Sequence, residues 1–325
     1  MADSQLPTSN MTEQQQPEQK YCCITGEPVY PPYNILGGRV YSDRAFAMVN
    51  KPHPGFWRSV VVQLVGMAIF AAVVAVLANL IGQPTQTVRI LLGLFLAIVP
   101  TALWLAYFYR QDRLEPEPKH RLGLVFMTAL LLTDVIARRL IYDWFRLQDW
   151  AAYDVGTSLA ASVLITSVTY TAITYVAVRM VYATEEFDER MDGVVYGSVA
   201  GLGIATLLNL RYIVENQGVE LAPGVVQTVT TALAMASFGG LLGWFMAEAK
   251  FTHKPVWWMP AGFIITAVLN GIFSWLIGEV AASGLTIEPW RSLAMGLAVA
   301  LVTFLALAVL MRRAIEVTLR RSTIG

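Results

Sequence analysis

Histidine and acidic residues are nearly absent from the long apolar runs of this sequence. The three histidines, His53, His120 and His253, all lie in polar stretches between those runs. Asp134 is the only acidic residue deep inside one of them. Metal sites in proteins are built from several carboxylate, imidazole or thiolate groups around one cavity. The sequence therefore predicts no metal site within the apolar runs, and it contains no motif for any other cofactor.

Charged residues are also scarce. Only 14% of the residues are charged, whereas 56% are hydrophobic, and this composition is too apolar for a soluble protein of this length. The chain is therefore predicted to be an integral membrane protein, with the lipid bilayer as its first partner. Lysine plus arginine equal aspartate plus glutamate, at 23 each, which argues against binding of nucleic acid.

Eight apolar runs are long enough to cross a bilayer, for which a helix needs about 20 residues. They are rich in Leu, Val and Ala and do not alternate with polar residues, which excludes a transmembrane β-barrel. An all-α bundle of about eight transmembrane helices is predicted. The runs cover about 59–82, 88–109, 122–145, 156–182, 192–214, 223–249, 256–278 and 290–311.

Basic residues lie mostly in alternate loops, a bias that sets the orientation of membrane proteins. They gather at both ends of the chain and in the second and sixth loops. This predicts a multi-pass protein of a bacterial plasma (inner) membrane with both termini cytoplasmic. Residues 1–20 are polar and predict a disordered cytoplasmic tail rather than a signal peptide. The transmembrane domain is expected at 56–316, followed by a cytoplasmic tail at 317–325.

A small cytoplasmic unit is predicted at 21–55. Short Val/Tyr runs between Gly and Pro turns indicate one or two hairpins. The unit resembles half of a zinc ribbon, with Cys22 and Cys23 in the first knuckle and with Ser42 and Ala45 in the second. Two adjacent cysteines do not make a tetrahedral zinc site. A metal-free knuckle, or a contact element for a cytosolic partner, is predicted.

Two motifs in the middle of the chain point to one protein family. The stretch from Tyr109 to Pro118, YRQDRLEPEP, matches a Tyr-x-x-Asp-Arg-x-Glu-Pro-Glu-Pro loop. The stretch from Glu186 to Gly197, EFDERMDGVVYG, matches a Glu-Phe-Asp-Glu-x-x-Asp-Gly-x-x-Tyr-Gly helix entry. With the glycines that follow, these motifs resemble the PrsW family of intramembrane metalloproteases over roughly 104–278.

The resemblance implies a catalytic metal site shared by four helices. In the family, one helix carries a Glu-Glu pair with a lysine after it, the next carries a Glu-Asn pair, and two later helices carry one histidine each. Counting from the matching motifs locates these positions here. They are Tyr170, Thr171 and Thr174 on the first helix, Leu208 and Asn209 on the second, and Thr231 and Asn270 on the last two.

Only one of these positions, Asn209, keeps the residue type of the family. The apolar runs also lack the catalytic groups that other classes of protease need. A serine nucleophile would have no intramembrane histidine or lysine as its base, and an aspartyl protease needs two buried carboxylates. We therefore predict no catalytic residue, and a non-catalytic pseudoprotease that acts as a binding, regulatory or assembly component.

Two alternative functions stay open. The first is a divergent but active intramembrane metalloprotease that cleaves membrane-anchored proteins. The second is a carrier, or an accessory subunit of a membrane complex, that uses Asp134 and Arg138. For the pseudoprotease, the expected partners are other membrane proteins or a transmembrane segment.

Hydroxyl and amide side chains stand where the family has acids and histidines. They predict either an interhelical hydrogen-bond network that fills the old cavity, or a retained polar pocket that binds a transmembrane segment or a lipid without cutting it. The residues of this predicted pocket are Tyr170, Thr171, Thr174, Asn209, Thr231 and Asn270.

Charged residues inside an apolar run are costly unless they are paired. Asp134 and Arg138 are four residues apart, which predicts an ion pair within one helix. Arg139 and Asp143 repeat this spacing. The run would then hold its charges without contributions from other helices.

Gly193, Gly197 and Gly201 share one face of a predicted helix. Small residues at four-residue spacing allow two helix backbones to approach closely. We expect this face to pack against another helix of the same chain, with dimerisation as the alternative.

Overall fold

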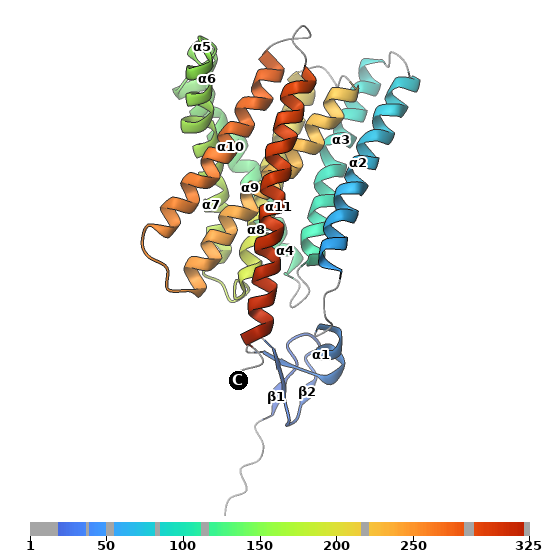
Figure 1. The fold of residues 1–325 in the computed structure, drawn as a ribbon, viewed down its shortest axis with the longest axis vertical. Coiled ribbons are helices and arrows are strands. Elements are labelled where there is room, and N and C mark those ends of the chain that lie inside the picture. Colours follow the sequence, from blue (N-terminus) through green and yellow to red (C-terminus); the bar gives the residue numbers. More distant parts are fainter. Residues whose placement is uncertain are drawn as a thin grey trace, which may run out of the picture. The chain divides into compact units, whose positions relative to one another are not determined.

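The computed structural model (Figure 1) describes the chain in seven stretches, which are 19–36, 39–49, 55–81, 85–111, 117–215, 221–282 and 289–321. Most of the predicted N-terminal tail, His53 and the middle of the first motif fall outside these stretches. The chain divides into two compact units, residues 53–317 and residues 1–52 with 318–325.

The N-terminal unit contains two short hairpins and one helix. Strand β1 (Lys20–Tyr21) pairs with β2 (Pro28–Val29), and β3 (Asn34–Leu36) pairs with β4 (Arg39–Tyr41). Both pairs are antiparallel. Helix α1 (Asp43–Val49) follows directly. The structure thus contains hairpins where the Gly and Pro turns predict them.

Cys22 lies in the interior of this unit and is only 2% exposed. Burial raises the pKa of its thiol, but hydrogen bonds with Thr25 and Ser42 outweigh that effect and lower the pKa to about 6. Ala45, in the second knuckle, is fully buried and offers only a methyl group. Cys23 is exposed, and the two adjacent thiols with a methyl group in the second knuckle do not fit a tetrahedral zinc site.

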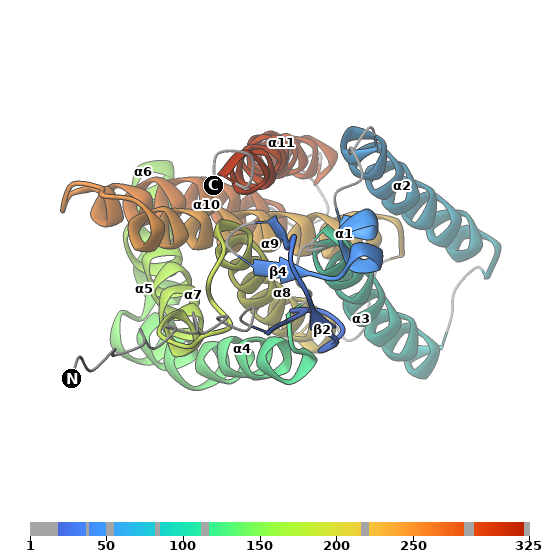
Figure 2. The same cartoon turned by 90° about the horizontal axis from the view of Figure 1, so that it is seen from below.

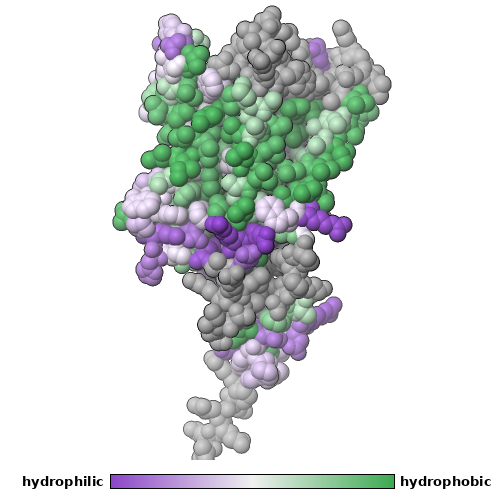
Figure 3. All heavy atoms as spheres, viewed as in Figure 1, coloured by the Kyte–Doolittle hydropathy of each residue, from purple (hydrophilic) through white to green (hydrophobic). Residues whose placement is uncertain are grey.

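The second unit is a bundle of long helices. Backbone polar groups cannot bond to water inside a bilayer, so a chain this apolar satisfies them within helices. Seven helices of the described residues are long and apolar enough to cross a membrane, and Figure 3 shows an apolar band across the bundle with polar side chains along its lower edge. The predicted transmembrane bundle is confirmed. Its helices are α2 (Phe56–Ile81), α3 (Gln86–Gln111), α4 (Lys119–Leu132), α5 (Leu147–Trp150), α6 (Val155–Ala161), α7 (Ser167–Tyr182), α8 (Arg190–Glu215), α9 (Leu221–Phe251), α10 (Trp258–Ala282) and α11 (Pro289–Arg321).

The third predicted run, 122–145, is helical but is not one regular α-helix. After α4 the backbone continues as π-helix in η1 (Thr133–Ala137) and η2 (Arg139–Trp144). A further π-helical stretch, η3 (Ser162–Thr166), precedes α7. Each π turn takes up an extra residue, and such turns are found often at functional sites. Asp134 lies on η1, Arg139 and Asp143 lie on η2, and Arg138 lies between the two. This run is not among the seven helices that are apolar enough to cross a membrane.

Helices α8 and α9 form the centre of the bundle. Figure 2 shows α8 enclosed by α3, α4, α7 and α9, and the same neighbours contact it in the structure. A Cβ atom added to Gly193 would lie 2.3 Å from the carbonyl oxygen of Gly243, and one added to Gly197 would lie 2.2 Å from that of Gly239. Such distances leave no room for any side chain. The glycine face therefore packs within the chain, as predicted.

Candidate functional site

The predicted pocket residues all lie in the interior of the bundle. Tyr170, Thr171 and Thr174 lie on α7, Asn209 on α8, Thr231 on α9 and Asn270 on α10, and their exposed fractions range from 2% to 7%. Leu208 is half-buried. Helices α7, α8 and α9 contact one another, and α10 contacts both α7 and α9. Four helices thus bring buried hydroxyl and amide groups into one interior.

Two of these side chains, Thr174 and Asn270, form hydrogen bonds within their own helix. The Thr174 hydroxyl donates to the Tyr170 carbonyl oxygen over 3.0 Å, and the Ser274 hydroxyl donates to the Asn270 side-chain oxygen over 3.3 Å. Asn209 differs, because its amide nitrogen donates to the Thr228 carbonyl oxygen of α9 over 3.1 Å. Asn209 is therefore the one predicted pocket residue whose side chain bonds to another helix in the described part of the chain.

Three hydroxyl groups of this interior stay without a hydrogen-bond partner in the described part of the chain. They belong to Thr171 on α7, Thr230 on α9 and Thr266 on α10. A buried polar group without a partner costs about 1–3 kcal/mol. These side chains leave hydrogen-bonding capacity unused on three of the four helices that carry the predicted pocket.

The interior does not supply the ligands of the metal site that the family resemblance implies. Within the described stretches, no three residues of the His, Cys, Asp and Glu types lie close enough together to hold a metal ion. The donors at the matching positions are neutral hydroxyl and amide groups, whereas zinc is held by imidazole, thiolate and carboxylate. These side chains do not fit a catalytic zinc ion.

The two family motifs come together at one end of the bundle. Glu117, from the first motif, is buried and accepts a hydrogen bond from the Tyr196 hydroxyl of the second. Arg121 forms an ion pair with Glu186 at 3.1 Å. Hydrogen bonds from its own backbone and from Thr184, together with Arg121, lower the pKa of the Glu186 carboxyl. From the sequence, Glu117, Glu186 and Tyr196 served only as family markers, and the contact between the two motifs was not predicted.

Asp192 and Lys250 fix the loop between α7 and α8. The Asp192 carboxylate, which is 2% exposed, accepts hydrogen bonds from the backbone N–H groups of Asp188 and Glu189 over 2.7 and 2.6 Å. The Lys250 ammonium donates to the carbonyl oxygens of Tyr182 and Phe187, each over 2.6 Å. The motif residues therefore build the fold at this end of the bundle.

Replacing Asp192 with alanine is expected to destabilise the protein by about 3 kcal/mol, because two backbone N–H groups lose a charged acceptor in a buried place. Thermal unfolding of the detergent-solubilised protein measures the loss. The matched control is Asp149→Ala, which removes an exposed ion pair with Arg146 and should cost less than about 1 kcal/mol. Equal losses for the two variants would contradict the structural role of Asp192.

The intramembrane charges pair differently from the prediction. Asp134 forms an ion pair with Arg211 of α8 at 2.8 Å, and Arg138 has no ion-pair partner among the described residues. The predicted pair between Asp134 and Arg138 is therefore wrong, because the packing of α8 against η1 brings a second arginine to Asp134. Arg139 likewise has no ion-pair partner in the described part of the chain. A hollow of about 560 Å³ lies beside this pair, and Tyr142 is among the residues that line it.

Comparison with known proteins agrees with this architecture. Three similar proteins are named Protease PrsW. The protein from Geobacillus kaustophilus is 30% identical over 183 residues, which cover 55% of this chain and 77% of that protein. The protein from Bacillus subtilis is 26% identical over 55% of this chain and 80% of its own length. The protein from Oceanobacillus iheyensis is 25% identical over 60% of this chain and 87% of its own length.

No solved structure matches the chain. The model of the PrsW family of intramembrane metalloproteases matches residues 117–311. This match includes the second motif, the glycine face and all of the predicted pocket residues. The chain therefore belongs to the PrsW family.

Proposed function

We propose that this multi-pass membrane protein is a pseudoprotease, which acts by binding rather than by cleavage. The observation that carries the proposal is the identity of the buried side chains at the family's catalytic positions. Thr171, Thr231 and Asn270 stand where the family has an acid and two histidines, and all three are buried. The helices are present, but the groups that would hold a metal and move a proton are replaced.

The chemistry of proteolysis needs both a metal and a base. A metal-bound water attacks only after it has lost a proton, which a nearby glutamate accepts in many zinc proteases. Leu208 supplies no base at the position where the family has its second-helix glutamate. Asp134, the acid deepest in an apolar run, is held by Arg211 instead.

The proposed role is that of a binding, regulatory or assembly component. Its partners would be other membrane proteins or a transmembrane segment, recognised by the polar interior or by the small N-terminal unit. The proposal includes a bacterial plasma membrane location with both termini in the cytoplasm, which the arginine and lysine bias supports.

The alternative is an active intramembrane metalloprotease. The names of the relatives favour it, since the proteins from Geobacillus kaustophilus and Bacillus subtilis are both called proteases. Such an enzyme would need to draw its ligands from outside the positions that match the family motifs. A carrier function has less support, because Asp134 is already paired with Arg211.

Metal analysis of the purified protein distinguishes a pseudoprotease from an active metalloprotease. The full-length chain should carry the substitutions Cys22→Ser and Cys23→Ser, because a thiol with a pKa of about 6 binds stray zinc at neutral pH. We expect the metal content to be far below one ion per chain when cells are grown with added zinc. The measurement is elemental analysis by mass spectrometry after purification without chelators.

The Geobacillus kaustophilus relative, purified in parallel, tests whether the procedure preserves a bound metal. One tightly bound metal per chain in the Cys22→Ser, Cys23→Ser protein would overturn the proposal. Cleavage of a membrane-anchored reporter by the same preparation would then establish the protease alternative.

A further inference from the structure

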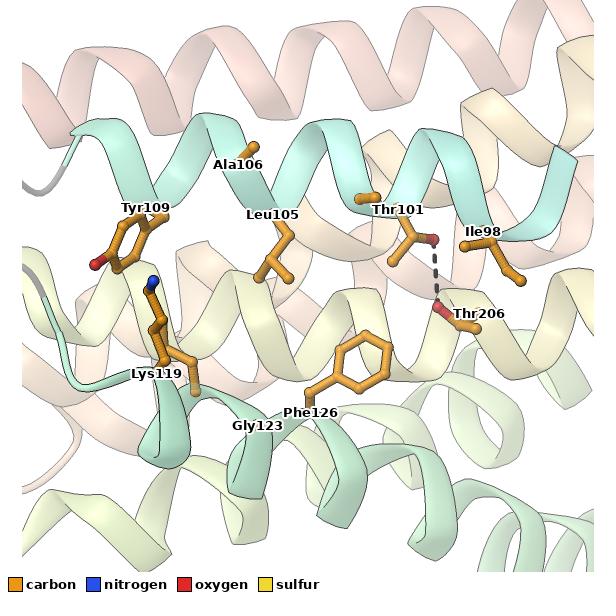
Figure 4. Close-up of a pocket in the computed structure, with 11 residues that line it drawn as sticks. Ile98, Thr101, Leu105, Ala106, Tyr109, Lys119, Gly123, Phe126 and Thr206 are labelled. Atoms are coloured by element: carbon orange, nitrogen blue, oxygen red, sulfur yellow. Dashed lines mark hydrogen bonds between the residues drawn. The ribbon is translucent and has the colours of Figure 1, made fainter. Parts of the chain in front are cut away.

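An apolar groove runs along the outside of the bundle between α3 and α4. It has a volume of about 630 Å³ and is partly open. Figure 4 shows Ile98 and Leu105 of α3 on the side that faces Phe126 of α4, and Ala106 and Gly123 also line this space. Helix α8 contacts both walls and contributes Thr206 to the lining. None of the predicted pocket residues lines the groove.

The middle of the groove has no polar group that needs a partner. The Thr206 hydroxyl lies 3.2 Å from that of Thr101, and each also bonds to a carbonyl oxygen of its own helix, at 2.8 Å for Thr206 and 3.0 Å for Thr101. The remaining lining residues there are aliphatic or aromatic. The occupant of this part should therefore be a hydrocarbon.

One end of the groove is different, because it carries a positive charge. Figure 4 shows the Lys119 ammonium directed toward the Tyr109 hydroxyl at the end where α3 finishes and α4 begins. Lys119 is exposed and forms no ion pair within the described residues. The first turn of α4 also has no side-chain cap. Basic pockets between transmembrane helices are typical sites for anionic lipid headgroups.

The groove is too small to enclose a transmembrane helix. One turn of an α-helix is about 10 Å across and 5.4 Å long and thus fills about 400 Å³. The groove would hold fewer than two turns, whereas a helix that crosses the bilayer needs about 20 residues. A single acyl chain is much narrower and can follow the groove along its length.

We propose that this groove binds one acyl chain of an anionic phospholipid, with the lipid phosphate at Lys119. In the proposed orientation, the lipid belongs to the cytoplasmic leaflet. Lipid tails gain little by moving from the bilayer to an apolar groove, because both surroundings are equally apolar. Selectivity therefore comes from Lys119, and the groove determines how the chain is placed. The proposal does not depend on whether the protein cleaves substrates.

Two variants of the full-length protein test the site. Gly123→Leu fills the groove, and a Cβ atom at Gly123 meets nothing within 4 Å, so the helix packing is kept. Lys119→Gln removes the charge. The matched control is Gly66→Leu on α2, where a Cβ atom also meets nothing within 4 Å. The delipidated proteins are titrated with phosphatidylglycerol and with phosphatidylcholine of identical chains, and bound lipid is counted by native mass spectrometry.

The wild-type protein and Gly66→Leu should bind phosphatidylglycerol more tightly than phosphatidylcholine. Lys119→Gln should lose about fivefold in affinity for phosphatidylglycerol, as expected for one basic residue, with no change for phosphatidylcholine. Gly123→Leu should weaken the binding of both lipids by the same factor, because it fills the space that the acyl chain would occupy. Equal binding of the two lipids by the wild type, or unchanged binding by Gly123→Leu, would overturn the proposal.

A photo-crosslinker at Ala102, which is exposed and lines the groove, identifies the occupant in native membranes. Capture of a phospholipid supports the proposal. Capture of a polypeptide instead would mean that a transmembrane segment occupies this surface.

Discussion

Replacing Gly197 with valine should prevent α8 and α9 from packing and should abolish the folded protein. A Cβ atom at this position lies 2.2 Å from the carbonyl oxygen of Gly239, and a backbone atom cannot move aside as a side chain does. The two helices would have to separate along their whole contact. Overpacking of this kind costs several kcal/mol, at the upper end of single substitutions. The yield of monodisperse protein in mild detergent measures the effect.

Gly66→Val on α2 is the control for the change in residue type. A Cβ atom at Gly66 meets nothing within 4 Å, so this variant should give the wild-type yield and unfolding temperature. A folded, monodisperse Gly197→Val protein would contradict the close packing of α8 and α9. Gly193 and Gly201 belong to the same contact. A Cβ atom added at either position would lie 2.3 or 1.9 Å from a backbone carbonyl oxygen of α9, respectively. A different packing of α8 on α9 would therefore require all three positions to move.

The class of the protein could be predicted from the sequence because it depends on local properties. Each apolar run has the length of the bilayer core, and its backbone can be satisfied only in a helix. The glycine face was also predictable, since Gly193, Gly197 and Gly201 share one side of α8 by their spacing alone. The burial of the predicted pocket residues followed from counting along helices whose ends the motifs mark.

Contacts between distant residues could not be predicted in the same way. Asp134 pairs with Arg211, which is 77 residues away, rather than with Arg138 at helical spacing. The Tyr196 hydroxyl reaches Glu117 across 79 residues. Such pairs depend on how helices pack, which one sequence does not show. The π-helical winding of η1 and η2 was missed as well, since no residue type marks it.

The family motifs and the polar interior have different roles in this chain. The residues of the two family motifs form buried hydrogen bonds that hold the helix ends together, as Asp192 and Glu117 show. Loss of these residues would damage the fold, whether or not the protein cleaves anything. The interior positions do not hold the helix ends together. A threonine or an asparagine at such a position can fill the space of an acid or a histidine. Under the proposed function, the chain keeps the architecture of the family without the family's metal ligands.

Restoring the family residues should create a metal site where the present side chains cannot hold one. The variant combines Thr171→Glu, Thr231→His and Asn270→His, which returns one carboxylate and two imidazoles to the buried faces of α7, α9 and α10. These three groups are a ligand set that catalytic zinc sites use. We expect about one zinc ion per chain, bound tightly enough to survive purification, because binding of the metal compensates for the buried ligands. Elemental analysis of the monodisperse protein, in the background that lacks both cysteines, provides the measurement.

The matched control moves one histidine to the outside of the bundle. It keeps Thr171→Glu and Thr231→His but carries Val268→His in place of Asn270→His, and Val268 is 38% exposed on α10. Two ligands are too few for a closed zinc site, so this control should retain little metal. A folded triple variant that binds no more zinc than its control would show that Thr171, Thr231 and Asn270 do not converge on one site. The assignment of these residues to the catalytic positions of the family would then be wrong, and the pseudoprotease hypothesis would lose its main support.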